Sequence, residues 1–108
     1  MSLVSKKCAV CEMGGSPLAK SEVDKFLIEI NDWQVSEDYK KISRRWKFKD
    51  FKEALNFVNR VGDLAEGEGH HPDIALGWGY VKIDLTTHAV KGLSENDFIL
   101  AAKIDRLE

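Results

Sequence analysis

The sequence predicts an α+β fold in which a single four-stranded antiparallel sheet has its helices packed on one face. Two patterns carry this prediction: apolar residues recur with helical spacing in three segments and alternate with polar residues in the strand segments. The expected order is α-β-β-α-β-β-α, and short turns inside each strand pair make its strands antiparallel. A sheet of this kind leaves one face for the helices to cover.

The N-terminal part shows the least periodicity. Residues 1–20 contain a Gly-Gly and a Ser-Pro pair, so we expect an irregular arm there, followed by one domain over residues 21–108. The first helix is expected to begin at Ser21, a candidate N-cap with Asp24 three residues later. Its apolar residues follow at helical spacing and are Val23, Phe26, Leu27 and Ile30.

The first strand pair and the central helix come next. Residues 33–35 form a candidate strand, and residues 40–48 alternate between apolar and polar side chains. Asp50 is a candidate cap for the central helix, and Gly67 and Gly69 are expected to end it. The helix carries one apolar stripe, formed by Phe51, Ala54, Leu55, Val58, Val61 and Ala65.

The second strand pair and the last helix complete the chain. Residues 74–76 and 81–87 are the expected strands, and residues 77–80 form the turn between them. One face of the longer strand holds Val81, Ile83, Leu85 and Thr87, and the other holds Lys82, Asp84, Thr86 and His88. Ser94 is a candidate cap for the last helix, with Asp97 in the third helical position.

Composition excludes several classes of function. The 108 residues suffice for one domain, and 16 lysines and arginines against 18 acids argue against non-specific nucleic-acid binding. No apolar run is long enough to span a bilayer, and the first residues lack a secretory pattern. Two cysteines cannot build a disulfide-rich scaffold, so we expect a cytoplasmic protein without membrane contact.

The three histidines are the candidate chemical groups. His70 and His71 follow the central helix, and Pro72 pushes His71 into an extended conformation, so the two rings should diverge. The hairpin should return His88 toward His70, which predicts one concave pocket suited to proton transfer near neutral pH. A three-histidine zinc site is the alternative, but diverging rings chelate one ion poorly, and we expect no metal. Histidines in exposed loops can also have no specific role.

The spacing of these residues resembles the signature of the pterin-4a-carbinolamine dehydratases. The matching positions are Glu66, His70-His71-Pro72, Trp78, His88 and Asp97, with Asp73, Leu85-Thr86-Thr87 and Gly92-Leu93-Ser94 around them. The similarity covers roughly residues 17–107. One position departs from the family: many members carry arginine where this chain has Asn96.

The resemblance implies dehydration of 4a-hydroxytetrahydropterin to quinonoid dihydropterin and water, in support of tetrahydropterin recycling for aromatic amino acid hydroxylation. It implies no cofactor, a pterin as the small-molecule partner and a homodimer or homotetramer. His70 and His88 become the acid and base candidates in either order, and His71 helps to hold the pterin. Further candidates for binding or orienting the substrate are Glu66, Pro72, Asp73, Trp78, Thr87 and Asp97.

Each supporting residue also has a structural explanation. Asp97 can serve as a helix cap alone, Glu66 as a solvated helix end, and Trp78 as an aromatic residue packed in its turn. Pro72 and Thr87 suit their conformations without any role in a site. Cys8 and Cys11 have the C-x-x-C spacing of metal and redox sites but lack a second pair.

Two other functions remain open from the sequence. The first is a binding module of the same fold, because animal members that resemble this chain also stabilise dimers of a transcription factor. The second is a dehydratase-like protein that acts on a different pterin, such as that of the molybdenum cofactor.

Overall fold

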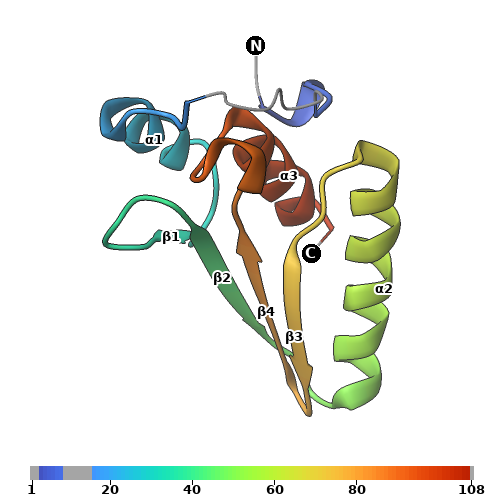
Figure 1. Cartoon of the computed structure of the whole chain (residues 1–108). Helices are drawn as coiled ribbons and strands as arrows, with labels where there is room; N and C mark the ends of the chain where they lie inside the picture. The colour runs from blue at the N-terminus through green and yellow to red at the C-terminus, as the bar shows by residue number, and fades with distance from the viewer. Residues whose placement is uncertain (1–2, 9–15, 108) are drawn as a thin grey trace.

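The computed structural model describes residues 3–8 and 16–107, and these ranges form one four-stranded antiparallel sheet with three α-helices (Figure 1). The α+β class and the order α-β-β-α-β-β-α are therefore confirmed, with two short 3₁₀ segments added. In chain order the elements are η1 (Leu3–Ser5), α1 (Lys20–Leu27), β1 (Gln34–Val35), β2 (Ile42–Lys47), α2 (Phe51–Glu68), β3 (Asp73–Gly77), β4 (Tyr80–Leu85), η2 (His88–Val90) and α3 (Glu95–Asp105).

The sheet has the strand order β1-β2-β4-β3, and each neighbouring pair is antiparallel. A tight turn joins β3 to β4, with Gly79 at a φ of 77°, where a residue without a side chain is favoured. Because Asp73 pairs with Asp84, the chain enters β3 and leaves β4 at the same end of the sheet. This register brings the segments that contain His70 and His88 to one end.

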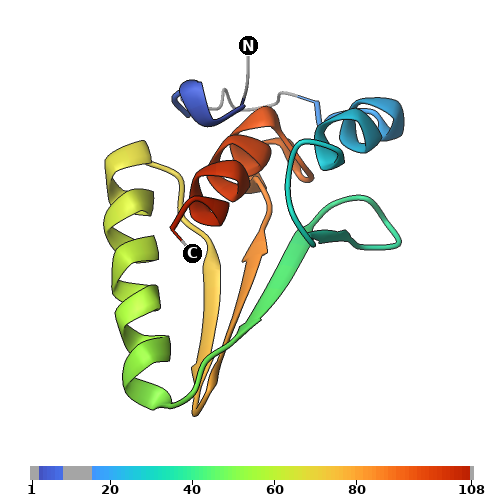
Figure 2. The same cartoon turned by 180° about the vertical axis from the view of Figure 1, so that it is seen from behind.

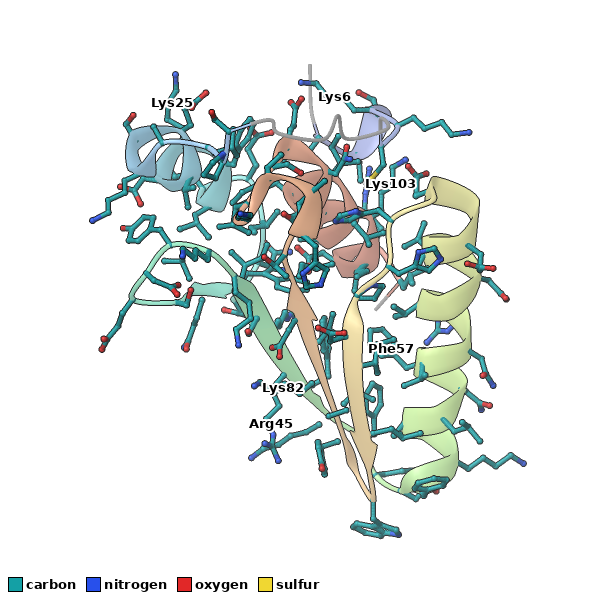
Figure 3. All side chains as sticks on the ribbon, in the orientation of Figure 1. Lys6, Lys25, Arg45, Phe57, Lys82 and Lys103 are labelled. Atoms are coloured by element: carbon teal, nitrogen blue, oxygen red, sulfur yellow. The ribbon has the colours of Figure 1, made fainter. Side chains whose placement is uncertain are left out.

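The helices pack on one face of the sheet, as predicted. Figure 3 shows Phe57 between α2 and the strands, whereas Arg45 and Lys82 project from the uncovered face. The back view in Figure 2 shows α3 beside the upper ends of the strands and α1 farther out. The largest fully buried side chains are Phe57, Phe98, Leu3, Ile42, Ile83, Leu85, Leu93, Leu100, Ile104, Val23, Val61 and Val81.

The ends of α2 follow the expected capping chemistry. The Asp50 carboxylate accepts a hydrogen bond from the Glu53 N–H at 2.9 Å, which caps the first turn. The helix passes through Gly67 and ends at Gly69, which has a φ of 68°. Only Gly69 therefore ends the helix, because its N–H bonds to the Ala65 carbonyl at 2.9 Å in a left-handed cap.

The predicted start of α1 at Ser21 is wrong. The helix begins at Lys20 with Ala19 as the N-cap residue, and Glu22 accepts a hydrogen bond from the Ala19 N–H at 3.1 Å. Asp24 accepts a hydrogen bond from the Tyr39 hydroxyl instead of capping. The longer glutamate side chain can reach back to the first free N–H, and this contact moves the helix start by one residue.

The strand predicted to run to Thr87 is shorter than expected. Strand β4 ends at Leu85, and Thr87 forms an isolated bridge with Gly92. His88 therefore opens the 3₁₀ turn η2 and does not end a strand. The Thr87–Gly92 bridge closes a tight loop, because backbone bonds in both directions join these two residues.

The described part of the N-terminal arm packs against the domain. Leu3 is buried in the core, and Lys6 forms an ion pair with Glu95 at 2.5 Å. The Cys8 N–H donates to Glu68 Oε1 at 2.9 Å. The division into an arm of residues 1–20 and a domain of residues 21–108 stays a prediction, and Cys11 lies outside the described residues.

Candidate active site

Asp97 is the most connected polar residue at the shared end of the sheet. Its carboxylate is 0% exposed and lies in the first turn of α3. Asp97 Oδ2 accepts a hydrogen bond from the Ser94 N–H at 3.0 Å and one from the Thr87 hydroxyl at 2.7 Å. The Thr87 hydroxyl has one hydrogen, which it donates to Asp97. The Ser94 hydroxyl is therefore the donor in its 2.8 Å contact with Thr87 Oγ1. Asp97 is therefore a helix cap with a second set of partners.

The other oxygen of Asp97 holds His70. The distance from His70 Nε2 to Asp97 Oδ1 is 2.6 Å, and the imidazole is only 12% exposed. An ionised carboxylate only accepts hydrogen bonds, so Nε2 carries the hydrogen between them. In a neutral ring, Nδ1 is then the nitrogen without a proton, which is the form that can accept one.

His71 contacts a different carboxylate. Its Nε2 is hydrogen bonded to Glu66 Oε2, and the side chains are 61% and 76% exposed. Gly69 turns the chain back after α2, which lets Glu66 in the last helical turn reach His71. The predicted divergence of the two rings is confirmed, because His70 contacts α3 and His71 contacts α2.

His88 lies on a separate surface feature next to Thr87. Together with Thr87 it lines an open hollow of about 470 Å³, whose wall also contains Lys40, Lys41 and Lys91. His70 and His71 do not line this hollow. The expectation of one pocket lined by all three rings therefore stays a prediction, and the Asp97–Thr87 hydrogen bond connects His70 to the His88 segment.

The remaining predicted residues divide between the two ends of the sheet. Pro72 and Asp73 directly follow the histidine pair, and Asp73 is exposed at the start of β3. Trp78 lies at the tip of the β3–β4 hairpin, the opposite end of the sheet, and is 74% exposed. The explanation that Trp78 packs in its turn is wrong, and within one chain it is also far from His70.

The environment of Cys8 disfavours ionisation of its thiol. Burial, followed by the charge of Glu68, raises the pKa of Cys8 to about 12. Within residues 3–8 and 16–107, no three histidine, cysteine or carboxylate side chains converge as ligands for a metal ion. No helix in these ranges is long and apolar enough to cross a membrane.

Sequence reasoning missed the lysines around His88. Lys40 and Lys41 come from the loop between β1 and β2, and Lys91 follows η2. Thr86 joins these segments, because its hydroxyl donates to the Lys40 carbonyl at 2.5 Å. The single available signal was Thr86 itself, a polar residue close to His88, and its partner lies 46 positions away in sequence.

Comparison with known proteins agrees with this fold. The sequence profile of the family described as Pterin 4 alpha carbinolamine dehydratase matches residues 16–107. A relative from Methylococcus capsulatus is 46% identical over 98% of this chain and 93% of its own length. One from Halorhodospira halophila is 48% identical over 99% and 98%. Both bear the provisional name pterin-4-alpha-carbinolamine dehydratase.

Two solved structures share the architecture. A transcriptional coactivator/pterin dehydratase from Brucella melitensis matches with a TM-score of 0.80 and 32% identity, over 85% of this chain and 98% of that one. A pterin dehydratase-like protein, described as a RuBisCO assembly factor in the α-carboxysome, matches with a TM-score of 0.61 and 26% identity, over 71% and 89%. Fold and sequence similarity agree, and the chain belongs to the pterin 4 alpha carbinolamine dehydratase family.

Proposed function

We propose that this protein is a hydro-lyase that dehydrates 4a-hydroxytetrahydropterin to quinonoid dihydropterin and water, without a metal or organic cofactor. Membership of the family and the names of the relatives support the reaction. The observation that carries the proposal is the arrangement around Asp97. Its two oxygens bind His70 and Thr87, the residue next to His88, so one buried carboxylate orients both segments.

The reaction needs two proton transfers and no change of oxidation state. The substrate carries a hydroxyl on the ring carbon next to a ring N–H. An acid donates a proton to the hydroxyl, the C–O bond breaks, and water leaves. A base removes the proton from nitrogen, and the electron pair of that N–H bond forms the new C=N bond. Imidazoles can perform both transfers near neutral pH.

The geometry favours one division of roles. His70 donates Nε2–H to Asp97, so its Nδ1 is available as the base that takes the proton from the ring nitrogen. His88 is exposed on the hollow and in this proposal supplies the proton for the leaving hydroxyl. His71 and Glu66, at the surface, help to hold the pterin.

The remaining predictions belong to the same proposal. Pro72 and Asp73 shape the rim next to His71, and Thr87 positions Asp97. Trp78 takes no direct part in a site formed by one chain, because it lies at the far end of the hairpin. The cytoplasmic location, the homodimer or homotetramer and the role in tetrahydropterin recycling also remain proposals.

The test is the decay of a synthetic 4a-carbinolamine, followed by absorbance after rapid mixing with the purified protein. We expect saturable acceleration that is unchanged after treatment with a chelator. Loss of activity on metal removal, with recovery on adding zinc, would replace the cofactor-free reaction with a metal-dependent one. Absence of any acceleration by folded protein would instead favour the binding-module function.

A further inference from the structure

The hollow beside His88 has a built shape. Its two walls are the loop between β1 and β2 and the turn that follows β4. Thr86 Oγ1 donates to the Lys40 carbonyl at 2.5 Å, and the Lys91 N–H donates to the His88 carbonyl at 3.1 Å. The first contact joins the two walls, and the second closes the turn within one wall, so both hold the backbone from which Lys40 and Lys91 extend. A volume of about 470 Å³ is in the range of small-molecule sites.

Positive side chains outnumber negative ones in the lining of this hollow. Three lysines line it, against a single acid, Asp38. Hydrogen bonds from the Ser36 hydroxyl and the Lys40 N–H already occupy Asp38, and they lower its pKa, so Asp38 stays ionised but engaged. Lys41 lies 3.9 Å from Asp84. Among the described residues, Lys40 and Lys91 form no direct ion pair, and the charge of Lys40 also helps to lower the pKa of Asp38.

This charge lies next to a proposed catalytic group. His88 and Thr87 belong to the wall of the same hollow, and Thr87 also hydrogen bonds to Asp97. A side chain that extends into this hollow from a pterin ring bound at His88 would meet Lys40 and Lys91. Lysine binds phosphate and carboxylate groups as a point charge, and such bonds are stronger than those to neutral groups.

We propose that this hollow binds the anionic end of a pterin side chain, either a phosphate ester or a carboxylate. The inference rests on the proposed function, because the ring must be bound at the histidines. It names the preferred substrate as an acidic pterin. Neutral side chains would leave the lysines solvated and would gain nothing from them.

The test uses matched carbinolamines whose side chains end in a hydroxyl, a phosphate ester or a carboxylate. We expect the better acidic substrate to exceed the neutral one in kcat/KM by about tenfold or more. The double variant Lys40→Gln/Lys91→Gln should lower this ratio by about tenfold, and added salt should lower it too. Lys52→Gln, an exposed lysine on α2 away from the hollow, should leave the ratio unchanged. The two acidic substrates identify which anion is preferred.

A binding measurement separates this inference from the dehydration itself. Stable oxidised pterins with and without the phosphate can be titrated by their own fluorescence. Lysine-dependent preference for the phosphate, without turnover of any carbinolamine, would support the anion site and refute the reaction. Equal turnover of acidic and neutral substrates, with no effect of the double variant, would overturn the anion site and leave the reaction standing.

Discussion

His70 and His71 are adjacent in sequence, yet their carboxylate partners differ in surroundings. The His70–Asp97 pair is 12% and 0% exposed, and Asp97 has two further hydrogen-bond donors. The His71–Glu66 pair is 61% and 76% exposed. Solvent screens the second pair, whereas the first is held by its neighbours. A histidine paired with a carboxylate can therefore be a buried, fixed contact or an exposed, weak one.

Removing the carboxylate from each pair should show the difference between the two pairs most clearly. Asp97→Ala leaves His70, Thr87 and the Ser94 N–H without their acceptor, so we expect a loss of at least about 3 kcal/mol in the free energy of unfolding. Glu66→Ala should cost under about 1 kcal/mol. Urea denaturation of both variants measures the difference. Similar losses would show that burial does not distinguish the pairs.

Asp97→Asn separates capping from catalysis. An amide oxygen can still accept from the Ser94 N–H, but the side chain loses the charge that fixes the tautomer of His70. We expect the protein to stay folded while kcat falls by about tenfold or more. Denaturation and carbinolamine turnover, measured on the same preparation, provide the check. Unchanged kcat would mean that Asp97 is only a cap.

Glu68 extends the comparison to a second carboxylate at the end of α2. Burial opposes its charge, but hydrogen bonds from Lys103 and the Cys8 N–H outweigh burial and lower the pKa of Glu68 from its ordinary value. Its stabilising effect is therefore present above the unfolded pKa and is lost as the pH falls through the lowered, folded value.

We expect Glu68→Gln to flatten the acid branch of the stability curve. The free energy of unfolding of wild type and variant is measured at pH 7, 5 and 3.5. These values span the unfolded pKa of glutamate, about 4.3. Wild type should lose the larger share of its stability between pH 5 and pH 3.5. Parallel stability curves for the two proteins would contradict a lowered pKa of Glu68 in the folded state. Glu66→Gln, at the exposed position, is the matched control.

His71→Ala should have the smallest effect. Its ring is exposed and paired only with Glu66, so we expect KM to rise by up to about fivefold, the equivalent of an exposed ion pair. The change in kcat should be smaller than that in KM. Steady-state kinetics over a range of carbinolamine concentrations separates the two constants. A fall in kcat as large as that of Asp97→Asn would move His71 into the proton-transfer step.

Local patterns were sufficient to predict the fold. Alternation predicted β2 and β4, and the residues at Asp50 and Gly69 predicted the limits of α2, because each depends on side chains only a few positions apart. The inward Arg44 escaped prediction. It forms an ion pair with Asp105 at 2.6 Å, and this partner lies 61 residues later.

In the candidate site, too, local patterns predicted some residues and missed those that depend on distant segments. Spacing placed His70, His71 and Pro72 after the helix and predicted that the two rings diverge, since Pro72 restricts its neighbour directly. The lysines around His88 were not predictable, because two loops from different parts of the chain form the hollow. The position of Trp78 was also misjudged, because its surroundings depend on which end of the sheet the hairpin tip occupies.

The most direct test of the proton-transfer mechanism is the turnover of a 4a-carbinolamine by the double variant His70→Ala/His88→Ala. Each single change should lower kcat by about tenfold or more. The folded double variant, verified by its unfolding curve, should leave the carbinolamine to decay at its uncatalysed rate. A folded double variant that keeps most of the wild-type rate would contradict catalysis by these histidines.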